Sequence, residues 1–316
     1  MLTISSYQAH INLREQMKLR RYRIPPKSDS QFHDNAIFPN FTPKFKLFPG
    51  EKIFTIGSCF ARNIETALLN TGFDVPVKNF KINDGEMPKN ISPTDILNEY
   101  NPGTILQRIE LLVNQTDTNL KAVEMSEDGK YTDLLLHIYS EPVFIDRLKE
   151  RREEIRSLYN EILSSQPIVI TLGLVECWFD SIDGCYLNKA PSKKNMDISP
   201  DRYSLHRMDS QDVLTRLTRA IELINSLDKK KIIITVSPIP LEATFTDQPA
   251  VMANSYSKAV LRIVSEQLRS SFDNVDYFPS YEIVSSGGVF NFYDDNTHIT
   301  PEIVPNIIKH MLKIYC

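Results

Sequence analysis

The chain has 316 residues, of which 41% are hydrophobic, so one α/β domain with insertions can bury a sizeable core. The formal net charge of −4 does not suggest the basic stripe of a nucleic-acid-binding protein, so we expect no nucleic-acid partner. The four cysteines have neither metal-ligand nor Cys-x-x-Cys spacing, and a chain of this size does not need disulfides for stability, which favours a reducing compartment. No set of His, Cys, Asp and Glu residues has convincing metal-ligand spacing, so we predict no metal site.

The first 46 residues are polar and interrupted by prolines, which predicts an arm packed on a main domain formed by residues 47–316. The start of the chain has no apolar signal-peptide core, and no stretch approaches about 18 apolar residues. We therefore expect a cytoplasmic protein without a membrane span.

Short apolar runs, two of which end at a glycine, predict buried strands at residues 52–57, 73–76, 167–173, 231–236 and 275–278. Helical patterns lie between and after them, at residues 61–70, from about 103, 143–164, 211–226, 254–270 and 301–314. This alternation predicts a parallel sheet of about five strands with helices on both faces. Active sites of such folds lie at the carboxyl ends of the strands, which here are Gly57–Ser58, Gly173–Leu174, Ser237–Pro238 and the segment after Phe278.

Ser58 follows a predicted strand and opens a predicted helix, so it is a candidate nucleophile. The unpaired N–H groups at a helix start would stabilise an alkoxide or an oxyanion, and Gly57 allows a sharp turn and a close approach of substrate. The alternative is that Ser58 only caps the helix. Cys59 is a rival nucleophile, because helix starts lower thiol pKa values, but a cysteine here is more often a small buried filler.

Asp295 and His298 stand three residues apart, just before the last predicted helix. This spacing lets the carboxylate reach Nδ1–H of the imidazole within a tight turn and leaves Nε2 free to act as a base. Asp294 is an alternative partner with a less suitable spacing.

Two further segments contain candidates for binding an oxyanion or a substrate. Gly173 can offer its backbone N–H at a strand end, while Glu176 and Trp178 follow just above the sheet. Trp178 either stacks on a sugar ring or closes the core. Before the helix at about 103, Asn101 offers a side-chain amide and Gly103 a backbone N–H, unless the segment is an ordinary turn.

His206 and Asn254 are weaker candidates. His206 falls in a predicted loop, where it is either a binding residue or a surface side chain. Asn254 either contacts substrate or only caps the helix that follows it.

Residues 53–61, which end in the letters GSCFA, resemble the signature of the GSCFA family. The resemblance covers roughly residues 45–310, and further blocks follow in order at residues 100–102, 171–178, 186–188, 235–240, 253–258, 277–282 and 295–298. The GSCFA family in turn resembles the SGNH/GDSL hydrolases. That resemblance implies a flavodoxin-like three-layer α/β/α fold, a catalytic serine at Ser58 and an Asp-x-x-His pair at Asp295 and His298.

The sequence departs from the SGNH pattern in one block. SGNH enzymes carry Gly-x-Asn-Asp there, and its Asn donates a hydrogen bond to the oxyanion. Here residues 173–176 read Gly-Leu-Val-Glu, and Val175 has no side-chain donor. The oxyanion must then be bound by backbone N–H groups of Ser58 and of Gly103 or Gly173, or by the amide of Asn101.

Together these features predict a serine esterase that acts on an O-acylated carbohydrate through an acyl-Ser58 intermediate. The family's association with bacterial polysaccharide biosynthesis implies the carbohydrate, and polar loops at residues 180–188, 192–207 and 244–248 suit hydroxyl groups better than lipid. No cofactor is expected. Two alternatives stay open: an O-acyltransferase with acyl-coenzyme A as co-substrate, and a carbohydrate- or nucleotide-binding protein without activity.

Overall fold

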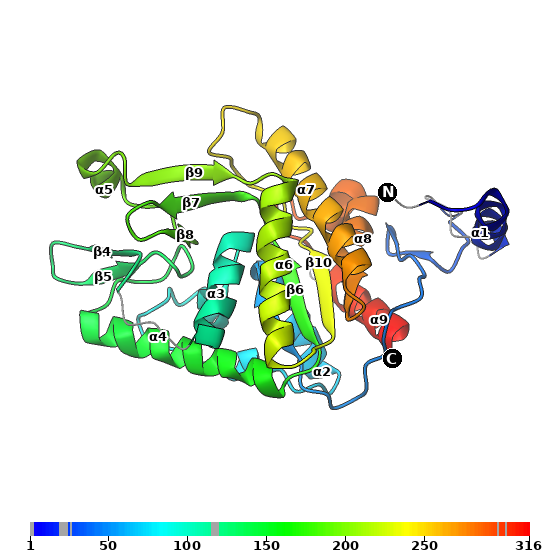
Figure 1. The fold of residues 1–316 in the computed structure, drawn as a ribbon, viewed down its shortest axis with the longest axis horizontal. Helices are drawn as coiled ribbons and strands as arrows, with labels where there is room; N and C mark the ends of the chain where they lie inside the picture. The colour runs from blue at the N-terminus through cyan, green and yellow to red at the C-terminus, as the bar shows by residue number, and fades with distance from the viewer. Residues whose placement is uncertain (1–2, 19–24, 26, 115–119, 296, 301) are drawn as a thin grey trace.

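In a computed structural model, which describes all residues except 1–2, 19–24, 26, 115–119, 296 and 301, the core of the chain is a parallel sheet of four strands (Figure 1). The strands lie in the order β11-β10-β6-β3 and pair in parallel throughout. Every strand is buried along its whole length, as expected for strands covered on both faces. Their bounds are β3 (Phe54–Gly57), β6 (Ile168–Leu172), β10 (Ile232–Val236) and β11 (Val275–Phe278).

The predicted strand at residues 73–76 is wrong, so the sheet has four strands rather than about five. Only Asp74 forms a bridge, with Lys52 beside β3. Pro76 has no N–H to donate to a ladder, and it begins the 3₁₀ helix η1 (Pro76–Asn79) instead.

Helices cover both faces of the sheet and complete the three-layer α/β/α architecture (Figure 1). Alternate strand residues point to opposite faces: Ile168 and Ile170 join one core cluster, and Val169 joins the other. One face is covered by α2 (Cys59–Asn70), α8 (Ser280–Ser286) and α9 (Ile303–Tyr315), and the other by α3 (Pro102–Asn114), α4 (Ile145–Tyr159), α6 (Ser210–Leu227) and α7 (Ala250–Ser271).

A second, antiparallel sheet of three strands is inserted between β6 and α6. It replaces the polar loops expected at residues 180–188 and 192–207. In Figure 1 it lies on the left beside a short hairpin, and β8 packs against α3. Its strands, in the order β8-β7-β9, are β7 (Glu176–Asp180), β8 (Cys185–Leu187) and β9 (Tyr203–Arg207), and the hairpin is β4 (Val123–Met125) with β5 (Tyr131–Asp133).

The two halves of the N-terminal arm differ. Helix α1 (Ser6–Lys18) has no buried residue and lies apart from the sheet in Figure 1. Further along, Ala36 and Phe38 are buried in the core on the α2 and α9 side, as is Leu47 just after the arm. The remaining elements are β1 (Phe32–His33), β2 (Ala36–Ile37), η2 (Pro93–Leu97), η3 (Asn160–Ser164), α5 (Lys193–Ile198) and η4 (Gly288–Asn291).

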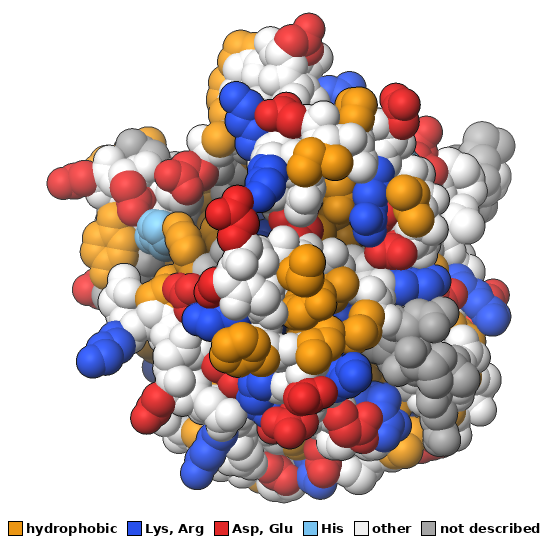
Figure 2. Space-filling model, turned by 90° about the vertical axis from the view of Figure 1, so that its left-hand side faces the viewer, with side chains coloured by type: hydrophobic (Ala, Val, Ile, Leu, Met, Phe, Trp, Pro, Cys, Tyr) orange, Lys and Arg blue, Asp and Glu red, His pale blue; other side chains and the backbone are white. Residues whose placement is uncertain are grey.

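Figure 2 shows one face of the molecule, on which basic and acidic side chains are interspersed among apolar ones. No block of a single sign of charge dominates the part of that face that the structure describes. None of the described helices is both long enough and apolar enough to cross a bilayer.

Candidate active site

Ser58 lies on the turn that joins β3 to α2. Gly57, just before it, has a φ of +140°, and a Cβ there would collide with the main-chain oxygen of Thr171, so only glycine fits. Ser58 stands at the N-cap position of α2, but its side chain makes no capping hydrogen bond. The hydroxyl is buried and has no hydrogen-bond partner among the described residues. Helix capping therefore does not explain this serine.

Ser58 lines a small cavity of about 100 Å³ at the carboxyl ends of β3, β6 and β10. Three of the four predicted strand ends thus meet there, while the segment after Phe278 does not line the cavity. The walls are mostly apolar. They are formed by Ser58, Cys59, Tyr100, Gly173, Leu174, Ser237, Ile239, Pro240 and Leu241.

Cys59 shares the cavity, but its chemistry differs from that expected at a helix start. Burial raises the pKa of its thiol to about 11, so the thiol stays protonated near neutral pH. A protonated thiol is a weak nucleophile, which leaves Ser58 as the candidate nucleophile of the cavity.

Asp295 and His298 form the predicted pair, with Nδ1 of the imidazole 2.8 Å from Oδ2 of the carboxylate. Asp295 also accepts the backbone N–H groups of Thr297 and His298. These bonds lower the pKa of Asp295 to about 2, the bond from Thr297 N–H having the largest effect. The side chain of His298 is 69% exposed, and no hydrogen bond within the described chain joins it to the Ser58 hydroxyl.

Gly173 is the predicted oxyanion donor that lies beside Ser58. A Cβ on Gly173 would stand 3.1 Å from Cβ of Ser58 and 2.7 Å from the main-chain oxygen of Tyr100. The Ser58 N–H donates to the main-chain oxygen of Thr171 at 3.2 Å, so it is already engaged. The backbone at Gly173 is therefore the better-placed of these two groups.

Asn101 and Gly103 are not among the residues that line the cavity. The Asn101 amide accepts the N–H of Thr104 and donates to the main-chain oxygen of Leu187, which uses both of its ends. At Gly103, a Cβ would collide with the Tyr186 ring. Both residues therefore serve the packing of α3 against β8, which sequence reasoning could not separate from an oxyanion role.

The loop that follows β10 is held by three of the predicted site residues, Glu176, Trp178 and Asn254. Glu176 accepts hydrogen bonds from the Thr244 hydroxyl and the Phe245 N–H, and the Trp178 ring packs edge-on against Phe245. Asn254 on α7 accepts the N–H of Leu241, a cavity residue. These three residues hold the loop rather than face the Ser58 hydroxyl.

His206 belongs to the second sheet. Its ring stacks on Phe179, with centroids 4.9 Å apart, and its nitrogens lie within hydrogen-bond distance of Tyr186 and Ser204. Neither His206 nor the other polar side chains predicted for sugar recognition lines the Ser58 cavity.

A comparison with protein-family models matches residues 52–311 to the GSCFA family. The chain belongs to the GSCFA family. The five letters of the GSCFA signature are Gly57 to Ala61, so the signature is the turn between β3 and α2 that places Ser58 in the cavity. No curated protein matches the chain.

One residue of this GSCFA site lies in the resemblance block at residues 253–258, but sequence reasoning gave it no role of its own. Lys258 on α7 is completely buried, and its Nζ donates to the main-chain oxygens of Gly173 and Ile239, each at 2.8 Å. Burial lowers the pKa of Lys258 to about 7. The sequence feature that could have identified Lys258 is its position within the apolar stripe of a predicted helix, where a lysine is unexpected.

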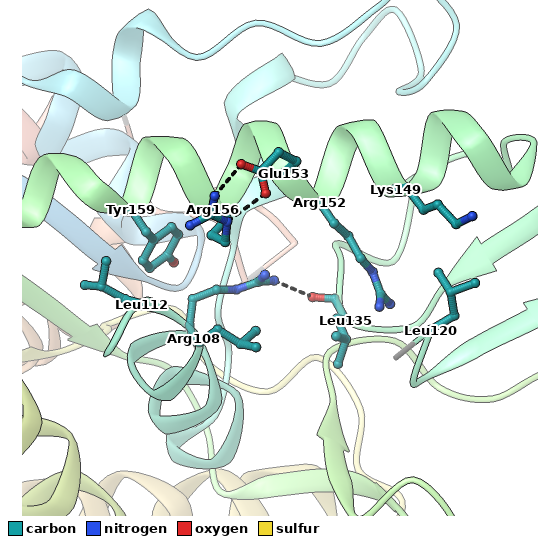
Figure 3. Close-up of a pocket in the computed structure, with 10 residues that line it drawn as sticks. Arg108, Leu112, Leu120, Leu135, Lys149, Arg152, Glu153, Arg156 and Tyr159 are labelled. Carbon is teal, nitrogen blue, oxygen red and sulfur yellow. Dashed lines mark hydrogen bonds and ion pairs between the residues drawn. The ribbon is translucent and has the colours of Figure 1, made fainter. Parts of the chain in front are cut away.

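A larger cavity of about 250 Å³ lies between α3 and α4 (Figure 3). Its three arginines have acidic partners: Arg108 pairs with Glu99, Arg152 with Asp133, and Arg156 with Glu153. None of the site residues predicted for the GSCFA chain lines this cavity. Within the described residues, no three His, Cys, Asp or Glu side chains gather closely enough to hold a metal ion.

Proposed function

We propose that the protein is a serine-dependent acyl-ester hydrolase in which Ser58 carries the acyl group. The observation that supports this most strongly is the Ser58 hydroxyl, which is buried in a cavity and has no hydrogen-bond partner in the described chain. Leaving a buried hydroxyl unpaired costs about 1–3 kcal/mol, which is unusual for a serine with a purely structural role.

In the proposed reaction, Ser58 Oγ attacks the ester carbonyl and gives its proton to His298 Nε2. Asp295 holds Nδ1–H of the imidazole and stabilises the imidazolium. The C–O bond to the alcohol then breaks, and the imidazolium returns the proton to the departing oxygen. Water attacks the acyl-Ser58 in the same way and releases the acid. The reaction requires the loop that carries His298 to approach Ser58 when substrate binds.

The cavity favours a short acyl group. Its volume of about 100 Å³ and its walls of Leu174, Ile239, Pro240 and Leu241 suit an acetyl group better than a fatty acyl chain. The expectation of a carbohydrate ester rests on the family resemblance, with the sugar outside this cavity. Passage of the acyl group from acyl-coenzyme A to a sugar hydroxyl is the alternative that an assay must separate.

The test combines a fluorophosphonate probe, which labels only an activated serine, with two activity assays. We expect labelling of the wild type, its loss in Ser58→Ala, and its retention in Cys59→Ala. One assay measures acetate release from acetylated oligosaccharides, and the other measures sugar-dependent thiol release from acetyl-coenzyme A. Acetate release supports the esterase, and thiol release supports the transferase. Silence in both assays without labelling would instead support a binding protein.

A further inference from the structure

Lys258 is a buried cation without an acidic partner. Its relative exposure is 2%, and no ion pair involves it among the residues that the structure describes. Lysine is almost never fully buried unless it is paired, because the ammonium loses its hydration. Such a charge needs an explanation from its surroundings.

The surroundings are the walls of the Ser58 cavity. Lys258 Nζ donates to Gly173 at the end of β6 and to Ile239 after β10, and both residues line the cavity. The preceding residue, Ser257, accepts the N–H of Val175 at 3.2 Å. Two consecutive residues of α7 therefore hold the turn at 173–175 beside Ser58.

This turn is also where the sequence departs from the SGNH hydrolases, since Val175 stands where those enzymes have an asparagine donor. We propose that Lys258 is a positioning residue that fixes Gly173 and Ile239 and places a positive charge behind the cavity wall. This charge stabilises the oxyanion that forms at Ser58, so the proposal rests on the acyl-Ser58 chemistry proposed above.

The physical basis is the weak screening of charge in a buried site. A cation that does not touch the substrate still acts on a developing negative charge there, because little water lies between them. The Gly173 carbonyl that Lys258 holds shares its peptide group with the Leu174 N–H, which donates to the main-chain oxygen of Tyr100 at 3.0 Å, so both ends of this peptide group are fixed. The effect of Lys258 therefore passes through the cavity wall and not through direct contact.

The charge on Lys258 changes near neutral pH, because burial lowers its pKa to about 7. The titratable group that interacts electrostatically with the Lys258 ammonium is Cys59 of α2, whose thiol stays protonated because burial raises its pKa. Asp95 of η2 and Tyr100 interact electrostatically with Cys59. On β7, Glu176 bonds to Thr244 and Phe245, while residues 173–175 and 237–241 carry no titratable side chain. The ammonium form should therefore decline above about pH 7.

The experiment measures the rate of fluorophosphonate labelling of the full chain from pH 5.5 to 9.5. We expect the wild-type rate to fall above about pH 7. Lys258→Met should lower the rate at pH 6.5 by about 10- to 100-fold, less than loss of a direct oxyanion donor, and should remove the fall at high pH. Lys258→Arg should keep the rate at high pH. Lys44→Met is the matched control, because Lys44 also donates to two main-chain oxygens, those of Arg269 and Phe272, at the far end of α7.

A purely structural lysine would change the rate without changing its pH profile. The role proposed for Lys258 is overturned if the wild-type rate does not fall above about pH 7, a result that needs no variant to fold. It is also overturned if folded Lys258→Met labels at the wild-type rate with the wild-type profile. Absence of wild-type labelling at every pH would instead overturn the acyl-Ser58 proposal, and the role of Lys258 with it.

Discussion

Nδ1 of His298 lies 2.8 Å from Oδ2 of Asp295, on a loop that leaves the larger part of the imidazole exposed. The pair is thus assembled before any bond to Ser58 is made. A base that is already oriented by its carboxylate needs only to be brought to the nucleophile.

His298→Ala should lower the fluorophosphonate labelling rate by about 10²- to 10⁴-fold, because the proton of Ser58 then has no acceptor. Asp295→Asn should lower it too, since the imidazole loses its orientation. His33→Ala is the matched control, because His33 forms a similar exposed pair with Asp34 and should leave the rate unchanged. Equal rates in His298→Ala and the wild type would exclude His298 as the base.

Gly57→Ala should destabilise the fold by more than about 3 kcal/mol, because the new Cβ meets the Thr171 oxygen in a backbone conformation that already disfavours side chains. Gly72→Ala separates the two effects. Gly72 has a φ of +90° with open space around it, so we expect a loss of only about 1–2 kcal/mol. Urea unfolding measures the free energy of unfolding of both variants. Similar losses in the two variants would show that the surrounding structure shifts to relieve the collision with Thr171.

Iodoacetamide should not modify Cys59 in the folded protein at pH 8. With a pKa of about 11, the thiolate is on the order of 0.1% of the population, and the side chain is only partly accessible. Cys316 is exposed and is the expected site of modification, while all four cysteines should react in denaturant. Mass spectrometry of the peptides gives the result, and rapid modification of Cys59 would restore it as a rival nucleophile.

Lys258 should also make stability depend on pH. Its pKa falls from 10.5 to about 7 on folding, so between these values the unfolded chain binds the proton that the folded chain lacks. The free energy of unfolding therefore rises with pH in this window, by up to about 1.4 kcal/mol per pH unit from this group. The free energies of unfolding of the wild type and of Lys258→Met are measured by urea unfolding from pH 6 to 9.5. The difference between them should rise with pH by this amount. A difference that does not change with pH would show that Lys258 keeps its proton in the folded chain over the whole pH range.

Leu241→Ala should widen the acyl preference, because it removes three carbons from the cavity wall. The ratio of kcat/KM for butyryl over acetyl aryl esters should rise by about tenfold or more, since each methylene accommodated in an apolar pocket changes the rate by roughly that factor. Leu227→Ala, at the exposed end of α6, is the control. A wild type that already prefers long acyl chains would contradict the assignment of this cavity to the acyl group.

The sheet and the Ser58 turn could be predicted because each signal is local. A short apolar run that ends at Gly57 indicates a buried strand and a sharp turn, and Asp295 and His298 are close in sequence. The role of Asn101 could not be predicted, since its amide is taken by Thr104 and Leu187, and the second partner is 86 residues away. The role of Lys258 could not be predicted either, because lysines on helices are usually exposed and only tertiary packing brings Gly173 and Ile239 to its ammonium.

Asn254, Ser257 and Lys258 lie on one face of α7. Asn254 and Lys258 bond to residues that line the cavity, and Ser257 bonds to Val175 in the adjoining turn. A helix of 22 residues moves as a rigid rod, so these contacts cannot loosen one at a time without breaking hydrogen bonds. Displacement of α7 would carry Leu241, Val175 and Gly173 together. We therefore expect access to Ser58 to depend on one collective motion of α7, on the microsecond-to-millisecond timescale of such helix shifts, and exchange broadening in NMR spectra should report all these positions with one common rate.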